Sequence, residues 1–169
     1  MTEKGVVVFN TPGANANAVK ELVLAGLLLS RRGIIGGIEY VNSLSEHGDK
    51  AELNKLVEAS KKKYKGSELK GKTLGVLGLG AIGSMVAEMA LQMDMTVLGY
   101  DPALSVEAAW RLSSQVKKME NMQSLFARSD VVTLHVPALE STRGLVNAEL
   151  LAGFKDGAVL LNFSREEIV

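Results

Sequence analysis

Three glycines at residues 78, 80 and 83, with the spacing Gly-x-Gly-x-x-Gly, are the residues best suited to binding a ligand through the backbone. Glycine allows a tight turn at Gly78, lets a phosphate approach the chain at Gly80, and permits close helix–strand packing at Gly83. A helix that begins here directs free N–H groups and its positive dipole end toward phosphates. The motif predicts a nucleotide site; the alternative is a glycine turn with a purely structural role.

Asp101, which ends the next predicted strand, indicates which nucleotide binds. Its carboxylate can accept hydrogen bonds from the two hydroxyls of an adenosine ribose, whereas a 2′-phosphate would meet it as a like charge. We therefore expect NAD, and not NADP, as the cofactor.

Two further groups of polar residues follow predicted strands. His135-Val136-Pro137 should line the cofactor crevice, because ligands bind at the carboxyl ends of parallel strands. The alternative is that Pro137 merely ends the strand and His135 packs against it; no carboxylate lies at an obvious spacing to make His135 an acid–base catalyst. His47 lies in a polar loop and should be solvated.

Arg165 closes the second group, Asn162-Phe163-Ser164-Arg165. A guanidinium at this edge suits a substrate carboxylate, which it can bind through two parallel hydrogen bonds. The alternative is a surface arginine paired with Glu166 or Glu167.

The elements that must position these residues alternate between strand and helix. Strands are predicted near 73–77, 96–100, 131–135 and 157–162, and the residues after the glycine motif recur at helical spacing. This alternation predicts an α/β fold with a Rossmann-type, doubly wound parallel sheet. A complete dinucleotide fold has six strands, so residues 1–169 are expected to form a single, truncated dinucleotide-binding domain.

The amino-terminal part predicts a lead-in to this domain within residues 1–32. Residues 5–10 read as a strand, and Asn15 or Asn17 could cap a helix that runs to about Arg32. This helix is apolar nearly all round, which indicates burial against another subunit or domain. Residues 33–37 should end it, and an exposed helix is expected over residues 49–63.

Two smaller features have competing interpretations. The basic run at residues 61–65 is best explained as a solvated helix end, with a phosphate or nucleic-acid patch as the alternative. Trp110, in a short helix over residues 105–111, is expected to be a packing anchor and not a base-stacking platform. Further short helices are expected at 121–126 and 148–154, with a loop at 136–146.

Composition excludes several classes of protein. Hydrophobic residues make up 47% of the 169, as in a globular chain, and 19 basic residues balance 19 acidic ones. The balance argues against nucleic-acid and membrane-surface partners. The chain has no cysteine and two histidines, which leaves no disulfide framework and disfavours a metal site. Residues 22–29 are too short an apolar run to span a bilayer and no signal peptide is evident, so a cytoplasmic location is expected.

Six segments spread over nearly the whole chain are specific when taken together: residues 10–13 with 15–21, 69–73, 78–83, 99–102, 135–137 with Thr142, and 161–165. In order and spacing they resemble the D-isomer-specific 2-hydroxyacid dehydrogenase family. The asparagine-rich segment at 15–17 favours its phosphoglycerate dehydrogenase branch.

This resemblance implies hydride transfer between NAD and a small 2-hydroxy or 2-oxo acid. Ala81 and Ile82 would hold the pyrophosphate through backbone amides, and Arg165 would hold the substrate's carboxylate and carbonyl. Further contacts to the cofactor are implied for Tyr100, Asp101, Pro102, His135, Val136, Pro137, Thr142, Asn162, Phe163, Ser164 and also Arg165. In such relatives the amino-terminal helix makes subunit contacts, so a homodimer or larger homo-oligomer is expected.

Two departures from the family pattern bear on activity. Glu166-Glu167 replaces the glycine that usually follows the arginine, which would weaken the arginine's attraction for a substrate carboxylate. The catalytic histidine and glutamate of the family have no counterpart in residues 1–169, nor has the substrate domain, so these residues alone should be inactive. A non-catalytic NAD-sensing dimerisation module is the first alternative, and a methyltransferase the second.

Overall fold

The computed structural model describes residues 2–7, 9–11, 13–45 and 48–169. His47, expected in a solvated loop, lies outside the described residues.

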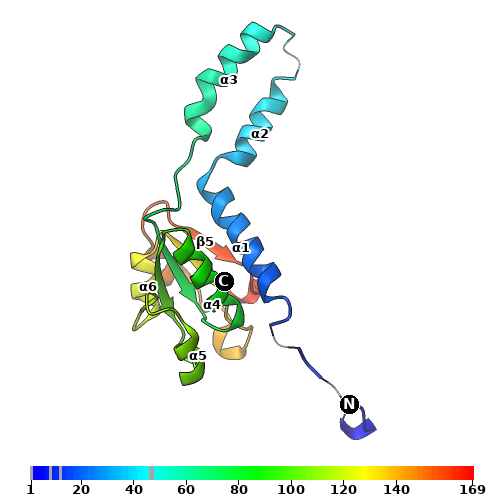
Figure 1. The fold of residues 1–169 in the computed structure, drawn as a ribbon, viewed down its shortest axis with the longest axis vertical. Helices are drawn as coiled ribbons and strands as arrows, with labels where there is room; N and C mark the ends of the chain where they lie inside the picture. Colours follow the sequence, from blue (N-terminus) through cyan, green and yellow to red (C-terminus); the bar gives the residue numbers. More distant parts are fainter. Residues whose placement is uncertain (1, 8, 12, 46–47) are drawn as a thin grey trace.

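A five-stranded parallel sheet forms the centre of the molecule (Figure 1). The strand order is β3-β2-β1-β4-β5, which matches five positions of the six-stranded dinucleotide-binding order. The predicted α/β, doubly wound parallel sheet is therefore confirmed. The strands are β1 (Thr73–Leu77), β2 (Thr96–Tyr100), β3 (Lys117–Lys118), β4 (Val131–Leu134) and β5 (Val159–Asn162).

Four of these strands were predicted, and the fifth, β3, was missed. It consists of two exposed lysines that pair with Leu98 and Gly99 of β2, so no apolar run announces it. The central strands behave as expected, because every residue of β4 is buried and β1 is buried from Leu74 onward. An apolar run that is buried on both faces is typical of a parallel sheet covered by helices.

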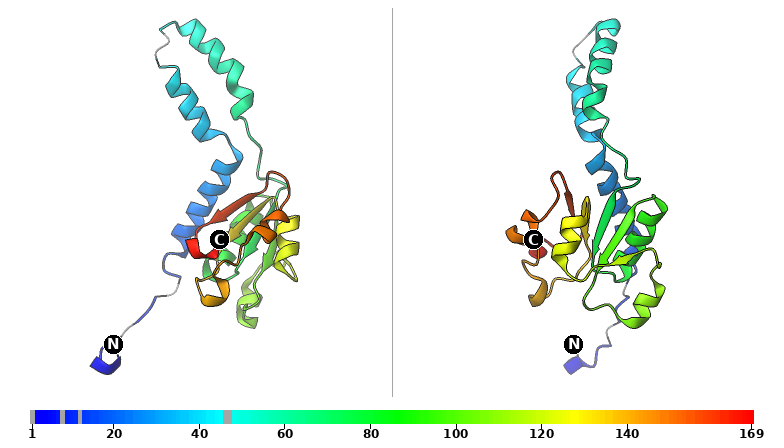
Figure 2. Two further views of the ribbon diagram at one scale, coloured as in Figure 1. Left: turned by 180° about the vertical axis from the view of Figure 1, so that it is seen from behind. Right: turned by 90° about the vertical axis from the view of Figure 1, so that its left-hand side faces the viewer.

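Helices cover both faces of the sheet (Figures 1 and 2). On one face, α1 (Ala16–Arg31) and α4 (Ala81–Gln92) contribute Val23, Leu27, Val86 and Ala90 to one hydrophobic cluster. On the other, α6 (Met122–Arg128) and α7 (Ala148–Ala152) contribute Leu125, Phe126 and Leu150 to a second. The shorter elements are helix α5 (Val106–Arg111) and three 3-10 turns (Thr2–Lys4, Glu140–Thr142, Glu166–Ile168).

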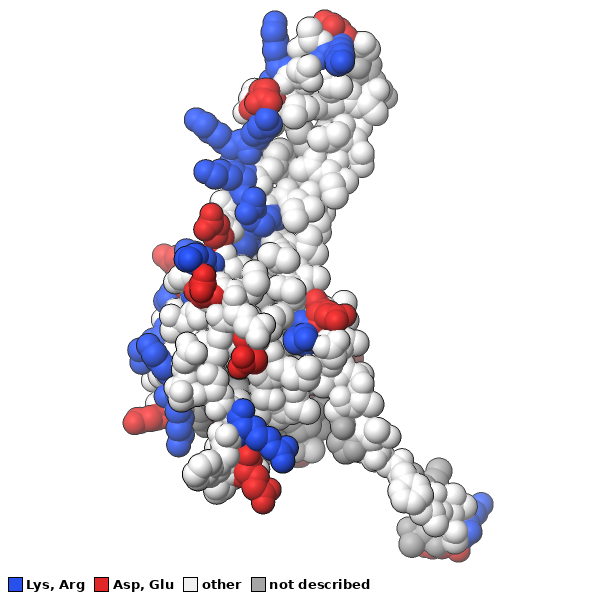
Figure 3. All heavy atoms as spheres, in the orientation of Figure 1, with Lys and Arg blue, Asp and Glu red and all other residues white. Residues whose placement is uncertain are grey.

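A helical hairpin, residues 34–64, extends away from the sheet (Figure 2). It consists of α2 (Ile34–Ser43) and α3 (Lys50–Tyr64), and neither helix has a buried residue in this chain. The stacked rings of Tyr40 and Tyr64 and a hydrogen bond from the Tyr40 hydroxyl to Leu56 O (3.2 Å) hold the two helices together. Lysines of α3 gather along one side of the hairpin (Figure 3).

Two sequence-based expectations are wrong, and one helix was not predicted. The described residues of 5–10 form no strand, because no neighbouring strand is there to pair with them. Residues 33–37 do end α1, but a new helix begins at Ile34 within them. Trp110 is 84% exposed and anchors no core, since α5 lies at the edge of the sheet.

Helix α1 buries only one side within this chain. Ala16, Val23 and Leu27 are buried, whereas Leu22, Leu28 and Leu29 on its other faces remain exposed. Among the described helices, none has both the length and the hydropathy that a membrane span requires.

Candidate functional site

The glycine motif lies where β1 ends, at the carboxyl edge of the sheet. Gly78 has φ +90°, a conformation that favours glycine, and a Cβ there would come within 2.8 Å of the His135 carbonyl group. Its N–H donates to Tyr100 O (2.9 Å), which continues the β1–β2 ladder by one bond. The turn therefore needs glycine both for its backbone angle and for the close approach of the β4 loop.

The two other glycines have the separate roles that their spacing predicts. A Cβ on Gly83 would overlap the Gly78 carbonyl, so this glycine permits the helix to pack on the turn. A Cβ on Gly80 would meet nothing within 4 Å, so the space above Gly80 is open. The first α4 bond runs from Ser84 N to Gly80 O (3.0 Å), which leaves the preceding helical amides without an intrahelical acceptor. Open space beside free amides at a helix start fits a pyrophosphate.

Asp101 ends β2 with both carboxylate oxygens already hydrogen-bonded. Oδ2 accepts from Leu79 N (2.8 Å), inside the glycine motif, and Oδ1 accepts from Ala103 N (2.9 Å). A carboxylate oxygen has a second lone pair, so each can still accept from a ribose hydroxyl.

A pocket of about 780 Å³ adjoins Asp101. Of the predicted site residues, Tyr100, Asp101 and Pro102 line it; most of the other lining residues are apolar and come from the glycine motif, α5 and the segment before and after β3. Trp110, the single tryptophan of the chain, is among them. The loops that follow β4 and β5 do not line this pocket.

The loop after β4 shapes the carboxyl edge of the sheet and supplies no group that titrates near neutral pH. His135 N donates to Leu77 O (2.8 Å), and the His135 Nε2 is 2.9 Å from Thr133 Oγ1, which is buried. Burial lowers the pKa of His135 to about 4, so the imidazole is neutral near pH 7. Val136 Cγ1 would lie 3.0 Å from a Cβ on Gly78, so this loop packs against the glycine turn.

Thr142 and Pro137 shape the same loop from within. The Thr142 hydroxyl donates to Pro137 O (2.6 Å) and accepts from Leu139 N (2.8 Å). Both bonds stay inside residues 137–142, so the hydroxyl stabilises the conformation of the loop.

The β5 loop is built around Arg165. Asn162 Oδ1 accepts from Ser164 N (3.0 Å) and its Nδ2 donates to Arg165 O (2.8 Å), while Ser164 Oγ donates to Leu134 O (2.9 Å) at the end of β4. The guanidinium of Arg165 is exposed and donates to Ser164 O (2.9 Å). Within the described residues, no ion pair joins Arg165 to Glu166 or Glu167.

Phe163 points away from this edge. A Cβ on Gly26 of α1 would come within 3.2 Å of the Phe163 ring, and Phe163 packs with the hydrophobic cluster on that face. Any contact of residue 163 with a cofactor would therefore involve its backbone.

Sequence reasoning missed three contributors: Leu79, whose amide binds Asp101; Thr133, which holds His135; and Gly26, which makes room for Phe163. Each acts across elements that are distant in sequence, or through the backbone, so residue type gave little signal. For Leu79, the position between two motif glycines was the available clue.

Comparison with known proteins agrees with this geometry. Residues 38–169 match the family model described as D-isomer specific 2-hydroxyacid dehydrogenase, NAD binding domain. The chain is 39% identical to a hydroxypyruvate reductase of Thermotoga maritima and 36% identical to a D-3-phosphoglycerate dehydrogenase of Methanocaldococcus jannaschii, each over 168 residues. These alignments cover 96% and 99% of this chain but 47% and 29% of the relatives, so the chain spans less than half of either protein.

Solved structures give the same result. A D-lactate dehydrogenase from Aquifex aeolicus, complexed with NAD and lactic acid, superposes with a TM-score of 0.77 at 29% identity, over 99% of this chain and 45% of that chain. An acyclic imino acid reductase in complex with NADPH and D-Arg superposes with a TM-score of 0.77 at 27% identity, over 99% and 48%. The chain therefore belongs to the D-isomer-specific 2-hydroxyacid dehydrogenase family, and its residues 38–169 match the NAD-binding domain of that family.

Proposed function

We propose that the protein to which this domain belongs oxidises or reduces a D-2-hydroxy acid with NAD, and that 3-phosphoglycerate is its substrate. The observation that carries the reaction class is Arg165, which is exposed and forms no ion pair with any acidic residue that the structure describes. Its loop is joined to the end of β4 by the hydrogen bond from Ser164 Oγ to Leu134 O. The phosphoglycerate assignment rests on the asparagine-rich segment at residues 15–17 and on the similarity to phosphoglycerate dehydrogenases.

Each part of the edge has one task in this proposal. The amides of Ala81 and Ile82 hold the pyrophosphate, and Asp101 accepts from the adenosine ribose hydroxyls. Arg165 binds the substrate carboxylate and thereby orients C2 toward the cofactor. NAD supplies the acceptor for the hydride. His135 moves no proton in this proposal, because it is neutral and held by Thr133.

Calorimetry of this chain with NADH, NADPH and S-adenosylmethionine tests the cofactor. We expect binding of NADH and much weaker binding of NADPH. A preference for NADPH would contradict the selective role of Asp101, and binding of S-adenosylmethionine alone would favour a methyltransferase. Residues 1–169 alone should produce no NADH from 3-phosphoglycerate, because the lowered pKa of His135, about 4, makes this histidine a poor proton acceptor near pH 7.

The whole protein tests the substrate and the role of Arg165. Arg165→Met should raise KM for the 2-hydroxy acid and lower kcat, because the carboxylate loses its partner, while the Kd for NADH stays within about threefold of wild type. The matched control is Lys155→Met, which removes a basic residue at the opposite edge of the sheet. It should leave KM, kcat and the Kd for NADH unchanged. Equal loss of NADH binding in Arg165→Met would place Arg165 in the cofactor site instead.

A second candidate function is a non-catalytic NAD sensor that dimerises. It is favoured by the exposed apolar side chains of α1 and of the hairpin, Leu22, Leu28, Leu29, Ile34, Ile35, Ile38 and Val41, which also support a homodimer or larger assembly in the enzyme. Turnover by the whole protein separates the two functions. Light scattering should give at least twice the monomer mass; a monomer would contradict the proposed assembly.

A further inference from the structure

We infer that Asp101 is a positioning residue for the glycine motif, in addition to the ribose contact that the proposed function gives it. The inference rests on the hydrogen bond from Leu79 N to Asp101 Oδ2, 2.8 Å long, which joins the motif to the end of β2. Because the carboxylate binds the backbone of the motif itself, it can order the turn independently of its contact with the ribose.

The Leu79–Asp101 bond forms just beyond the last backbone hydrogen bond between β1 and β2. Gly78 N donates to Tyr100 O (2.9 Å). Beyond this bond the two segments separate, since β1 leads into the glycine turn and β2 leads toward α5. The Asp101 side chain then supplies the next acceptor along this line. Without it, the Leu79 N–H would lose its protein partner, and a buried donor without a partner is strongly disfavoured.

Leu79 is held from its other end as well. Its side chain is 6% exposed and belongs to the hydrophobic cluster beneath α1 and α4. A Cβ on Gly99 would come within 2.8 Å of Leu79 Cδ1, so the absence of a side chain at Gly99 makes the seat for this leucine. Amide and side chain together fix Leu79, and Leu79 lies directly before Gly80, above which a pyrophosphate would lie.

The second carboxylate oxygen prevents the side chain from turning away. Asp101 Oδ1 accepts from Ala103 N (2.9 Å), so rotation of the carboxylate would break two bonds at once. The charge that excludes a 2′-phosphate is thus fixed in place by the same bonds that order the motif. Removing it to admit NADPH would also loosen the turn that binds the pyrophosphate.

The experiment compares ADP with 2′,3′-dideoxy-ADP, which keeps the diphosphate but lacks both ribose hydroxyls. If Asp101 only recognises ribose, Asp101→Ala should bind dideoxy-ADP as wild type does. We expect instead a loss of about tenfold or more, the loss of one hydrogen bond to a charged group. Asp101→Asn, whose amide oxygen can still accept from Leu79 N but whose Nδ2 cannot accept from Ala103 N, should recover part of the dideoxy-ADP affinity without restoring the preference for ADP.

Amide hydrogen exchange of the ligand-free chain supplies an independent readout. Exchange at Leu79 should be at least about fivefold faster in Asp101→Ala than in wild type, because the amide has lost its acceptor. Asp94→Asn is the matched control, since it removes a distant exposed carboxylate and asparagine tolerates the positive φ (57°) there. Unchanged exchange at Leu79, or unchanged dideoxy-ADP affinity in Asp101→Ala, would overturn the inference. Failure of wild type to bind NADH would instead overturn the proposed function and leave the exchange result to decide this one.

Discussion

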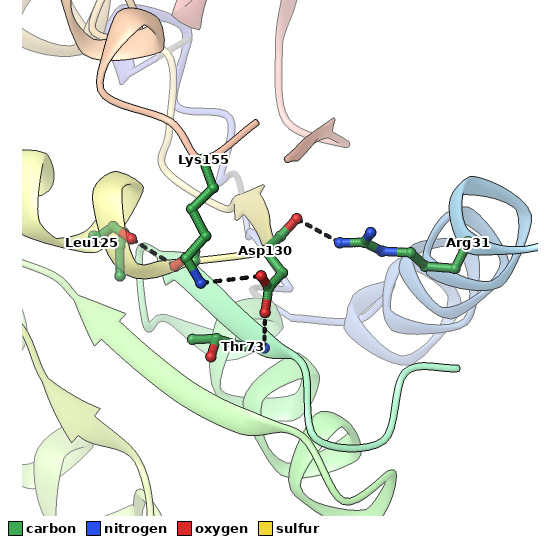
Figure 4. Close-up of polar contacts among 6 residues, drawn as sticks. Arg31, Thr73, Leu125, Asp130 and Lys155 are labelled. Carbon is green, nitrogen blue, oxygen red and sulfur yellow. Dashed lines mark hydrogen bonds and ion pairs between the residues drawn. The ribbon is translucent and has the colours of Figure 1, made fainter. Parts of the chain in front are cut away.

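Asp130 should stabilise the opposite end of β1, and its removal provides a test of how the sheet is fastened. Its Oδ2 accepts from Thr73 N (2.7 Å), the first residue of β1, and its Oδ1 accepts from Lys155 Nζ (3.1 Å) (Figure 4). Its backbone oxygen accepts from Arg31 of α1 (2.7 Å), a bond that does not depend on the side chain. Asp130→Ala should therefore remove two bonds of the cluster and leave the third.

The magnitude follows from these two bonds. A hydrogen bond from a backbone amide to a charged acceptor contributes about 1.5–3 kcal/mol to stability. The Asp130–Lys155 ion pair, whose side chains are 25% and 40% accessible, contributes about 0–1 kcal/mol. Asp130→Ala should lower the free energy of unfolding by about 2–3 kcal/mol, which is about 4–12 °C in Tm for a chain of this size. Lys155→Ala should lower it by less than about 1 kcal/mol.

The same carboxylate predicts a pH dependence. Burial alone would raise the pKa of Asp130, but the hydrogen bond from Thr73 and the charge of Lys155 together hold it below its ordinary value. A lowered carboxyl pKa stabilises the fold above the unfolded value of about 3.9, and this contribution is lost as the pH falls through the folded pKa. The stability difference between wild type and Asp130→Ala should be constant near neutral pH and shrink below about pH 3.9.

Urea or thermal unfolding, followed by circular dichroism at several pH values, measures the stability of wild type and of both variants. NADH affinity below the unfolding transition should be unchanged in Asp130→Ala, since Asp130 lies at the amino edge of the sheet, away from the glycine motif. A loss below about 0.5 kcal/mol in Asp130→Ala, or an equal loss in Lys155→Ala, would refute the assignment of the energy to the Thr73 bond.

Two other predictions separate folding from binding and locate a second titration. Gly80→Ala should have an unfolding free energy within about 0.5 kcal/mol of wild type, because its Cβ meets nothing, but should lose NADH binding because the methyl group occupies the pyrophosphate's place. Gly83→Ala should lose both stability and binding. Calorimetry and melting curves measure both quantities, and a destabilised Gly80→Ala or a stable Gly83→Ala would contradict these roles. Burial lowers the pKa of His135 to about 4, so its contribution to stability is complete above pH 6.5 and is lost as the pH falls toward 4. His135→Gln should therefore flatten the plot of unfolding free energy against pH between these values. An unchanged slope would mean that His135 titrates normally.

The sequence by itself determined the sheet and the position of the cofactor edge. Apolar runs that are buried on both faces can be recognised locally, so β1, β2, β4 and β5 were predicted, as was the turn at Gly78. Strand β3 was not, because it is two exposed lysines that become a strand only by pairing with β2. Residues 5–10 failed in the opposite way: a β-branched run has strand propensity, but a strand needs a neighbour.

Only the tertiary structure decided how the site residues are held. Asp101 and Leu79 meet because β2 and β1 lie side by side, and Ser164 meets Leu134 because β5 and β4 do. Phe163 faces α1, and not the crevice, because Gly26 leaves space there. A hydrogen bond to a backbone amide cannot be predicted from residue type, because every residue except proline has such an amide. The sequence could therefore name the carboxylate and the glycines, while the folded chain alone showed that the carboxylate binds the motif itself.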